Sequence, residues 1–196
     1  MSNGSCVLRI LASPYLETIE LNPVQSLLYR SMENLGVEVA GFSGRRLLFE
    51  QWDIWHLHWP ESIVNEPNAS RVAVRLLKFW AKLKLARIRN MKIFWTVHNL
   101  RPHDRDHPLL EQIFWHMFLP NVDGLICMSE SGKQQLYRQH VRARAHPVYV
   151  IPHGHYRGVY PDSMSREHAR RALRSSQMNL SSPSSAAFGR TRAFPN

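Results

Sequence analysis

The sequence predicts an α/β fold built on a doubly wound parallel sheet. Six short stretches rich in β-branched and aromatic residues alternate with stretches of helical periodicity. The first 42 residues already spell a strand, a helix and a second strand, which is one βαβ unit. Polar residues follow several of the strands directly. In an open parallel sheet, the loops beyond the carboxyl ends of the strands form the ligand crevice, so this edge is where a site is expected.

The first βαβ unit begins with a strand at residues 6–11 and ends with a strand at residues 37–42. Between them, Asn22 and Pro23 predict a helix start, with Asn at the N-cap and Pro at the first helical position. Gly36 ends this helix. Its buried face is expected to hold Val24, Leu27, Leu28, Ser31 and Leu35. The unit carries no G-x-G-x-x-G motif, so the usual dinucleotide fingerprint is absent.

Four more strands follow, separated by helices. The strands are expected at residues 53–58, 91–97, 123–128 and 147–152. The helices are expected at residues 69–89, 108–119 and 129–140, with a short helix or loop at 45–49 and a last helix at 165–173. The serine-rich remainder has no periodicity and predicts a flexible tail. We therefore expect one domain over residues 1–161, followed by a linker helix and a disordered tail over residues 162–196.

Composition limits which class of protein this chain can belong to. The 196 residues are 44% apolar, which is enough for a core. No signal peptide and no apolar run of membrane-spanning length are visible, which favours a cytoplasmic location. Cys6 and Cys127 fall in predicted strands and are expected to be buried, reduced thiols.

Positive charge is concentrated in one block. The formal net charge is +10, and residues 67–102 contain nine Lys or Arg and no carboxylate. Such a block predicts an anionic neighbour, which could be nucleic acid, an anionic membrane face or a phosphorylated substrate. No RNP, KH or helix-turn-helix pattern appears, so nucleic acid is not expected as a partner.

The segment from Lys92 to Asp104 combines a buried strand with a reactive loop. Its apolar, β-branched start ends abruptly at His98, and polar side chains then follow closely. A histidine at a strand end can act as a general base toward a hydroxyl, or can donate a hydrogen bond without titrating. Asp104 or Asp106 could orient it. No G-x-S-x-G elbow and no phosphate-binding G-x-x-x-x-G-K-[ST] loop is present.

The third strand carries two histidines and three tryptophans. His56 and His58 are two residues apart and are expected on the same face, about 7 Å apart along the backbone. Trp52 and Trp55 are expected in the core. Trp59 lies at the strand end, where it could stack on a sugar ring.

Further histidines cluster near other strand ends, at His103, His107, His153 and His155. A polar site at one edge of the sheet is one interpretation of this clustering. Zinc ligation is a weaker alternative, because the spacing matches no strong zinc pattern. Loop histidines bonded to backbone groups are the plain structural alternative.

The basic helix carries a narrow cationic stripe. Its members are Arg71, Arg75, Lys78, Lys82 and Arg89. Leu76, Leu77, Phe79, Trp80, Leu83 and Ile88 supply the apolar surface of this helix. The stripe predicts docking on anionic lipid head groups or a lipid-linked phosphate, and an ordinary solvated helix face is the alternative.

Three strings of residues together resemble a known family. They are DIWHLHWPE at residues 53–61, WTVHNLRPH at 95–103 and VIPHGHY at 150–156, with supporting matches at 22–29 and 128–132. In this order and spacing they resemble the amino-terminal domain of GT-B glycosyltransferases. The nearest kin are bacterial exopolysaccharide enzymes, including the GumI-like mannosyltransferases. The resemblance covers about residues 6–173.

The resemblance implies an acceptor-side Rossmann-like domain, the amino-terminal half of a GT-B enzyme, often placed at a membrane. It implies that His98 is catalytic, as a base or an orienting group. It implies substrate-binding roles for His58, Trp59, Glu61, Asn99, Arg101, His103, Glu130, His153 and Gly154. The expected partner is a glycan or lipid-linked acceptor, with a nucleotide-sugar as donor for the complete enzyme and no cofactor bound by this chain alone.

The chain departs from the family pattern in length, because a complete GT-B enzyme is about twice as long. The donor domain is missing, which indicates a truncated or frameshifted reading frame or a separate donor-domain chain. We therefore expect the isolated chain to transfer no sugar. The alternative is a non-catalytic module that binds anionic lipid or glycan through residues 71–89, peripheral at the inner face of the membrane. A metal-dependent hydrolase is a third hypothesis and would require bound zinc.

Overall fold

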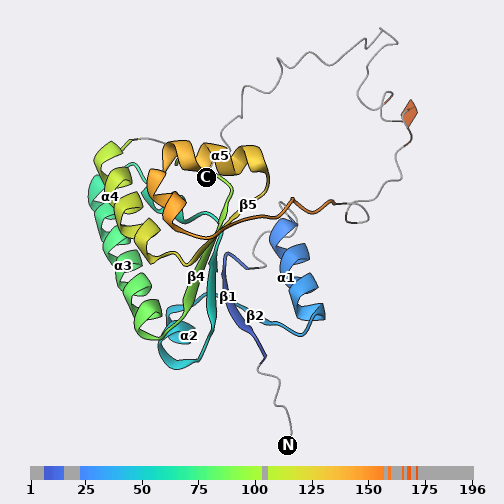
Figure 1. Ribbon diagram of the computed structural model, residues 1–196, viewed down its shortest axis with the longest axis horizontal. Helices are drawn as coiled ribbons and strands as arrows, with labels where there is room; N and C mark the ends of the chain where they lie inside the picture. The colour runs from blue at the N-terminus through green and yellow to red at the C-terminus, as the bar shows by residue number, and fades with distance from the viewer. Residues whose placement is uncertain are drawn as a thin grey trace, which may run out of the picture. The chain divides into compact units, whose positions relative to one another are not determined.

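A six-stranded, wholly parallel sheet forms the centre of the fold, as predicted (Figure 1). The structure is a computed structural model that describes residues 7–15, 23–102 and 106–156, together with residues 159, 165, 167, 168 and 171. The chain divides into two units, residues 1–155 and 156–196. The sheet belongs to the first unit, and its strand order is β2-β1-β3-β4-β5-β6.

All six predicted strands are present, most of them shorter than expected. Their bounds are β1 (Arg9–Ser13), β2 (Glu38–Gly41), β3 (Ile54–Leu57), β4 (Lys92–Val97), β5 (Gly124–Cys127) and β6 (Val148–Val150). Cys127 is buried in β5 as expected, and Cys6 lies outside the described residues. Leu57 of β3 pairs with both Ser13 of β1 and Trp95 of β4, so the ends of these strands lie at one edge.

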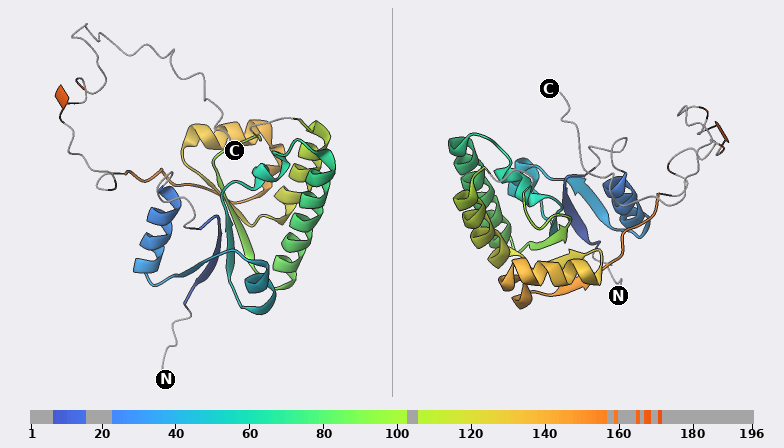
Figure 2. Two further views of the ribbon diagram at one scale, coloured as in Figure 1. Left: turned by 180° about the vertical axis from the view of Figure 1, so that it is seen from behind. Right: turned by 90° about the horizontal axis from the view of Figure 1, so that it is seen from above.

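Helices cover both faces of the sheet. They are α1 (Val24–Asn34), α2 (Gly44–Phe49), α3 (Ala69–Ile88), α4 (Pro108–Phe118) and α5 (Glu130–Gln139), with 3₁₀ turns η1 (Pro60–Val64), η2 (Leu119–Asn121) and η3 (Val141–Ala145). Figure 2 shows α1 on one side of the sheet and α3 with α4 on the other. No helix in the described ranges is long and apolar enough to cross a membrane.

In the second unit the structure describes few residues. Glu167, His168 and Arg171 are helical, within the predicted helix at 165–173. The predicted tail at 174–196 lies outside the described residues.

Helix starts follow the expected capping chemistry. The Asn68 side chain accepts from Arg71 N at the start of α3, and the Ser129 side chain accepts from Gly132 N at the start of α5. For α1 the cap residue is Pro23 itself, one position later than expected, and Asn22 lies outside the described residues.

The main core lies between the sheet and the α3–α4 side. Trp55 and Trp95 of the sheet are fully buried there against Phe114 and Phe118 of α4. Phe118 lies 5.4 Å from the Trp95 ring and 5.4 Å from the Phe114 ring, measured between ring centroids. Trp52 is also buried, so the core placement expected for Trp52 and Trp55 is confirmed. This close aromatic packing makes the α3–α4 side of the sheet rigid.

On the side of the sheet under α1, the predicted helix face is right for Leu28, which packs against the core there, and wrong for Ser31 and Leu35. The buried residues of α1 are Gln25, Ser26 and Tyr29. Leu35, expected inside, is 84% exposed, and Ser31 is exposed as well. The helix is rotated because Tyr29 reaches histidines at the end of β3, a contact that the apolar periodicity of α1 does not encode.

Gly124 sits where a larger residue would collide with the neighbouring strand. A Cβ there would lie 2.5 Å from the Phe94 ring. We expect Gly124→Ala to lower the free energy of unfolding by about 1–3 kcal/mol through overpacking. Urea unfolding measures this. Gly44→Ala, at a position with no atom within 4 Å of the added Cβ, is the matched control and should change little. Equal effects of the two changes would contradict the packing described for β4 and β5.

Candidate functional site

His98 lies directly after β4, at the carboxyl edge of the sheet, and is half-buried. The end of β3 supplies its neighbours. His58 Nδ1 lies 2.9 Å from His98 Nε2, and the Trp59 ring stacks on His98 with centroids 4.5 Å apart and planes 27° apart. The structure therefore brings together three residues expected to belong to one site.

A buried line of polar groups continues inward from His58. The Tyr29 hydroxyl lies 2.7 Å from His58 Nε2 and 3.1 Å from His56 Nδ1. His56 Nε2 lies 2.8 Å from Thr96 Oγ1. The expectation that His56 and His58 share a face is confirmed, with ring centroids 4.5 Å apart. Five side chains from α1, β3 and β4 thus form one connected network ending at His98.

Burial keeps these histidines neutral at physiological pH. Desolvation, with a smaller effect of neighbouring histidines, lowers the pKa of His56 to about 4 and that of His58 to about 2. Desolvation and the charge of His153 lower the pKa of His98 to about 4. Burial raises the pKa of the Tyr29 phenol, which therefore keeps its proton. A low pKa makes His98 a weak base and a neutral hydrogen-bonding group.

Asn99 is supported by a buried carboxyl group from η1. Asn99 Nδ2 donates to Glu61 Oε1 at 3.1 Å, and Glu61 is only 2% exposed. Desolvation raises the pKa of Glu61 to about 7, although hydrogen bonds from its backbone N–H and from Asn99 oppose the shift. Glu61 Oε2 has no hydrogen-bond partner in the described part of the chain. Because the Glu61 carboxyl group is buried, it acts on a ligand by holding the Asn99 side chain in place.

A largely apolar cavity of about 540 Å³, called here the aromatic cavity for its Phe42, Trp55, Trp59 and Phe79 side chains, opens beside Trp59. Its lining residues come from the ends of β1 and β3, from η1 and from α3. They include Ser13, Phe42, Trp55, Trp59, Ile63, Phe79 and Lys82. Lys82 Nζ lies 5.3 Å above the Phe42 ring, so a cation sits at an otherwise apolar cavity. A cavity of this size and lining suits an amphiphilic ligand with an anionic group.

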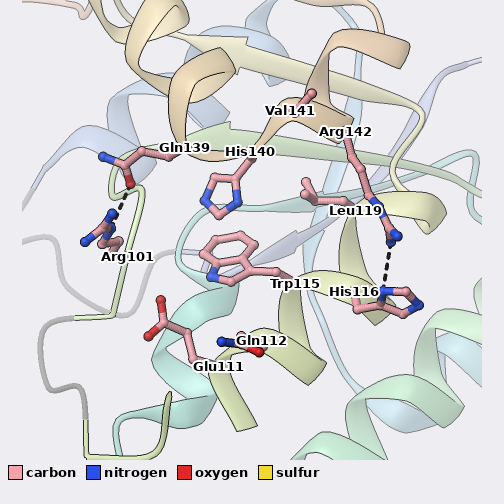
Figure 3. Close-up of a pocket in the computed structure, with 10 residues that line it drawn as sticks. All are labelled: Arg101, Glu111, Gln112, Trp115, His116, Leu119, Gln139, His140, Val141 and Arg142. Carbon is pink, nitrogen blue, oxygen red and sulfur yellow. Dashed lines mark hydrogen bonds between the residues drawn. The ribbon is translucent and has the colours of Figure 1, made fainter. Parts of the chain in front are cut away.

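Arg101 belongs to a second cavity, of about 470 Å³, between α4 and the α5–η3 segment (Figure 3). Its Nε donates to Gln139 Oε1 at 3.0 Å. The Trp115 and His140 rings face each other in this cavity with centroids 4.2 Å apart. Arg101 thus shares the His98 loop but lines a different cavity from Trp59.

The other residues expected in the site are placed less closely. Glu130 is the exposed first residue of α5. His153 is exposed, with Nδ1 2.7 Å from Gly154 O, and its charge reaches His98. A Cβ on Gly154 would meet no atom within 4 Å, so this backbone is open to a ligand. His103 lies outside the described residues.

Among the described residues, a histidine contacts the His98 ring, whereas the sequence analysis named Asp104 or Asp106 as groups that could orient it. That histidine is His58. Asp104 lies outside the described residues, and Asp106 is exposed. The sequence analysis did not identify Tyr29 and Thr96 as site residues, because each lies in a segment with ordinary helix or strand periodicity. The one available signal was a tyrosine beside Gln25 and Ser26 on a polar strip of α1.

No cluster of three potential metal ligands occurs among the described residues.

The cationic stripe of α3 is only partly available to a partner. Arg71 and Arg75 form ion pairs with Glu66, at 3.6 Å and 2.8 Å. Arg89 donates to the carbonyl groups of Leu48 and Glu50 and so ties α3 to α2. Lys78 is exposed, and Lys82 faces the aromatic cavity.

The Glu61 carboxyl group generates a prediction about stability and pH. Its pKa is raised in the folded state, so its favourable contribution is full below the unfolded pKa of 4.5 and is lost as pH rises through about 7. Glu61→Gln should therefore raise the free energy of unfolding at about pH 8 by about 3 kcal/mol and change it little at about pH 4. Urea unfolding at the two pH values measures this.

The exposed Glu130→Gln is the control and should show no such pH dependence. A Glu61→Gln effect that is the same at both pH values would contradict the burial of an ionisable carboxyl group.

Comparison with known proteins gives a glycosyltransferase relative. The chain is 28% identical over 158 residues to two Xanthomonas campestris pv. campestris proteins described as GDP-mannose:glycolipid 4-beta-D-mannosyltransferase. The match covers 76% of this chain and 39% of the relatives, so it spans well under half of their length. No family model matches the chain. The resemblance predicted from the sequence is thus confirmed: the chain is similar to part of a glycosyltransferase, and it has a Rossmann-like α/β fold.

Proposed function

We propose that this domain is the acceptor-side half of a glycosyltransferase that uses a nucleotide-sugar donor and a glycan or glycolipid acceptor. The observation that carries the proposal is the position of His98. It lies half-buried at the carboxyl edge of the sheet, stacked on Trp59 and followed by Asn99, whose side chain is held by Glu61. Ligands of open parallel sheets bind at this edge.

The side chains at this edge suit a sugar. An aromatic ring offers its face to the C–H groups of a pyranose, and Trp59 and His98 together present such a surface. The Asn99 amide can bond sugar hydroxyl groups. Catalysis would then rest on alignment, because an acceptor hydroxyl held beside His98 is placed for attack on the anomeric carbon of the donor.

The aromatic cavity beside Trp59 suits the remainder of a lipid-linked acceptor. Its Phe42, Trp55 and Phe79 side chains would cover an apolar chain, and Lys82 would pair with a phosphate. The relatives named above act on a glycolipid according to their description, which agrees with this assignment.

The donor is proposed to bind on a separate domain. The sequence carries neither a G-x-G-x-x-G fingerprint nor a phosphate-binding G-x-x-x-x-G-K-[ST] loop. The description of the relatives names GDP-mannose as their donor, and a nucleoside diphosphate sugar is the donor class proposed here. The open backbone at Gly154 is where the donor's diphosphate would approach this domain.

The test is transfer of radiolabelled mannose from GDP-mannose to a bacterial glycolipid extract. The full chain is assayed alone and together with the part of the Xanthomonas relative that the match does not cover. We expect transfer only in the combined reaction, and a loss of roughly 100-fold or more in His98→Ala, because that variant lacks a preorganised hydrogen-bond group beside the acceptor hydroxyl. His146→Ala, remote from the edge of the sheet, is the control and should retain activity.

Turnover by the chain alone would refute the need for a separate donor domain. Unchanged transfer by a folded His98→Ala variant would refute the role of His98.

A second function, docking on an anionic membrane, is favoured by the outer face of α3. Its core face buries Leu76, Phe79 and Leu83, whereas Leu77 and Ile88 are 65% and 77% exposed. Val74 and Trp80 are also exposed on this face. Exposed apolar residues beside a row of cations are typical of helices that lie in a membrane interface. We propose that α3 places the domain on the inner leaflet, next to a lipid-linked acceptor.

Leu77→Glu should abolish binding to vesicles of phosphatidylglycerol and phosphatidylethanolamine, because it puts a carboxylate into the apolar face that meets the lipid. Co-sedimentation measures the bound fraction. Leu35→Glu, at the exposed end of α1 on the other side of the sheet, is the matched control and should bind like the unmodified protein. Binding that survives Leu77→Glu would exclude α3 as the docking face.

A further inference from the structure

Thr96, Tyr29 and three histidines form one continuous line of hydrogen bonds. From the inside outward, the distances are 2.8 Å from Thr96 to His56, 3.1 Å from His56 to Tyr29, 2.7 Å from Tyr29 to His58 and 2.9 Å from His58 to His98. His56 and His58 each use both ring nitrogens. His98 uses Nε2, and its Nδ1 has no partner among the described residues.

Three arrangements of the hydrogens place one hydrogen in each of the four contacts. All three histidines are neutral near pH 7, so each ring carries one N–H and one bare nitrogen. The phenol and the Thr96 hydroxyl each have a single hydrogen. The hydrogens can run outward from Thr96 to His98, inward from His98 to Thr96, or from both ends to the Tyr29 oxygen, which then accepts from His56 and His58. The third arrangement leaves the hydrogen of the buried Tyr29 hydroxyl without an acceptor among the described residues, which is costly. The direction decides whether His98 offers a ligand an N–H or a bare nitrogen.

The inner end of the line favours the outward direction. Thr96 is buried, and His56 is the only partner of its hydroxyl among the described residues. In the outward arrangement the hydroxyl donates to His56 Nε2. In the inward arrangement it accepts from His56, and its own hydrogen is buried without an acceptor, which is the more costly state.

The distances agree with the same direction. Hydroxyl donors make shorter hydrogen bonds than N–H donors. In the outward arrangement the hydroxyl groups of Thr96 and Tyr29 donate across 2.8 Å and 2.7 Å. The ring N–H groups of His56 and His58 donate across 3.1 Å and 2.9 Å. The inward arrangement would require the Tyr29 hydroxyl to donate across the longest of the four contacts.

We propose that Thr96 and Tyr29 are positioning residues that hold His56, His58 and His98 as Nδ1–H tautomers, so that His98 presents an N–H to the ligand. The ligand atom that faces His98 is then an oxygen with a free lone pair, either of a sugar hydroxyl or of a phosphate. This ligand-facing role rests on the proposed function, whereas the tautomers do not. Proton uptake at His98 Nδ1 would require the hydrogens of His98 and His58 to move to their Nε2 atoms and the Tyr29 hydrogen to leave His58, so the resting group is a hydrogen-bond donor and the acceptor hydroxyl loses its proton elsewhere.

The test is a long-range ¹H–¹⁵N correlation spectrum of the full chain at about pH 7 without ligand, which distinguishes protonated from bare ring nitrogens. The imidazole signals are assigned by single His→Gln substitutions. We expect His56, His58 and His98 all to carry the proton on Nδ1. A proton on Nε2 of any of the three would overturn the proposal.

Tyr29→Phe tests the role of the phenol, because it removes the donor to His58 Nε2. We expect the Nε2–H form of His98 to rise to a measurable population in this variant. Tyr15→Phe is the matched control, because Tyr15 lies 5.7 Å from the Tyr29 ring but donates to Glu33, outside the line. His98 that remains wholly Nδ1–H in folded Tyr29→Phe would overturn the assignment of Tyr29. A combined reaction that transfers no sugar would contradict the proposed function alone, since these spectra need no substrate.

Discussion

The hydrogen bonds of the Tyr29 hydroxyl are the interaction on which the candidate site depends. The phenol is fully buried, and it joins α1 to two histidines at the end of β3. A buried polar group without a hydrogen-bond partner is costly. The buried side chains of Tyr29, His56 and His58 therefore depend on one another for their hydrogen bonds. This requirement fixes the rotation of α1 and directs Gln25 and Ser26 inward, where apolar residues would be usual for an amphipathic helix.

The two faces of the sheet differ in character: one is an apolar core and the other carries buried polar groups. On the α3–α4 side, aromatic rings such as Trp95, Phe114 and Phe118 pack closely and hold β3 and β4 in register. On the α1 side, the same two strands direct His56 and Thr96 into a polar layer. His98 follows β4, where both layers end, so a rigid apolar core positions a side chain whose chemistry is set from the opposite face.

Neutral histidines suit a domain that binds sugar oxygens. With a pKa of about 4, the His98 side chain is neutral near pH 7. It is an effective hydrogen-bond partner because it is already partly desolvated. Trp59 and Glu61 come from the same β3–η1 segment and set the ring plane of His98 and the amide of Asn99. These contacts orient both side chains at the carboxyl edge of the sheet.

The sequence by itself determined the strands, the helices and their parallel order, because hydrophobic periodicity, capping residues and βα alternation are local properties. It also indicated His58, Trp59 and His98 as neighbours, since parallel strands end at one edge. Only the tertiary structure decided which face of α1 is buried and which α3 cations are occupied. Tyr29 bonds to β3, and Arg89 bonds to carbonyl groups near α2. Both contacts join residues far apart in the chain, so no local pattern encodes them, and the hydrogen-bond line to His98 exists only once α1, β3 and β4 are packed together.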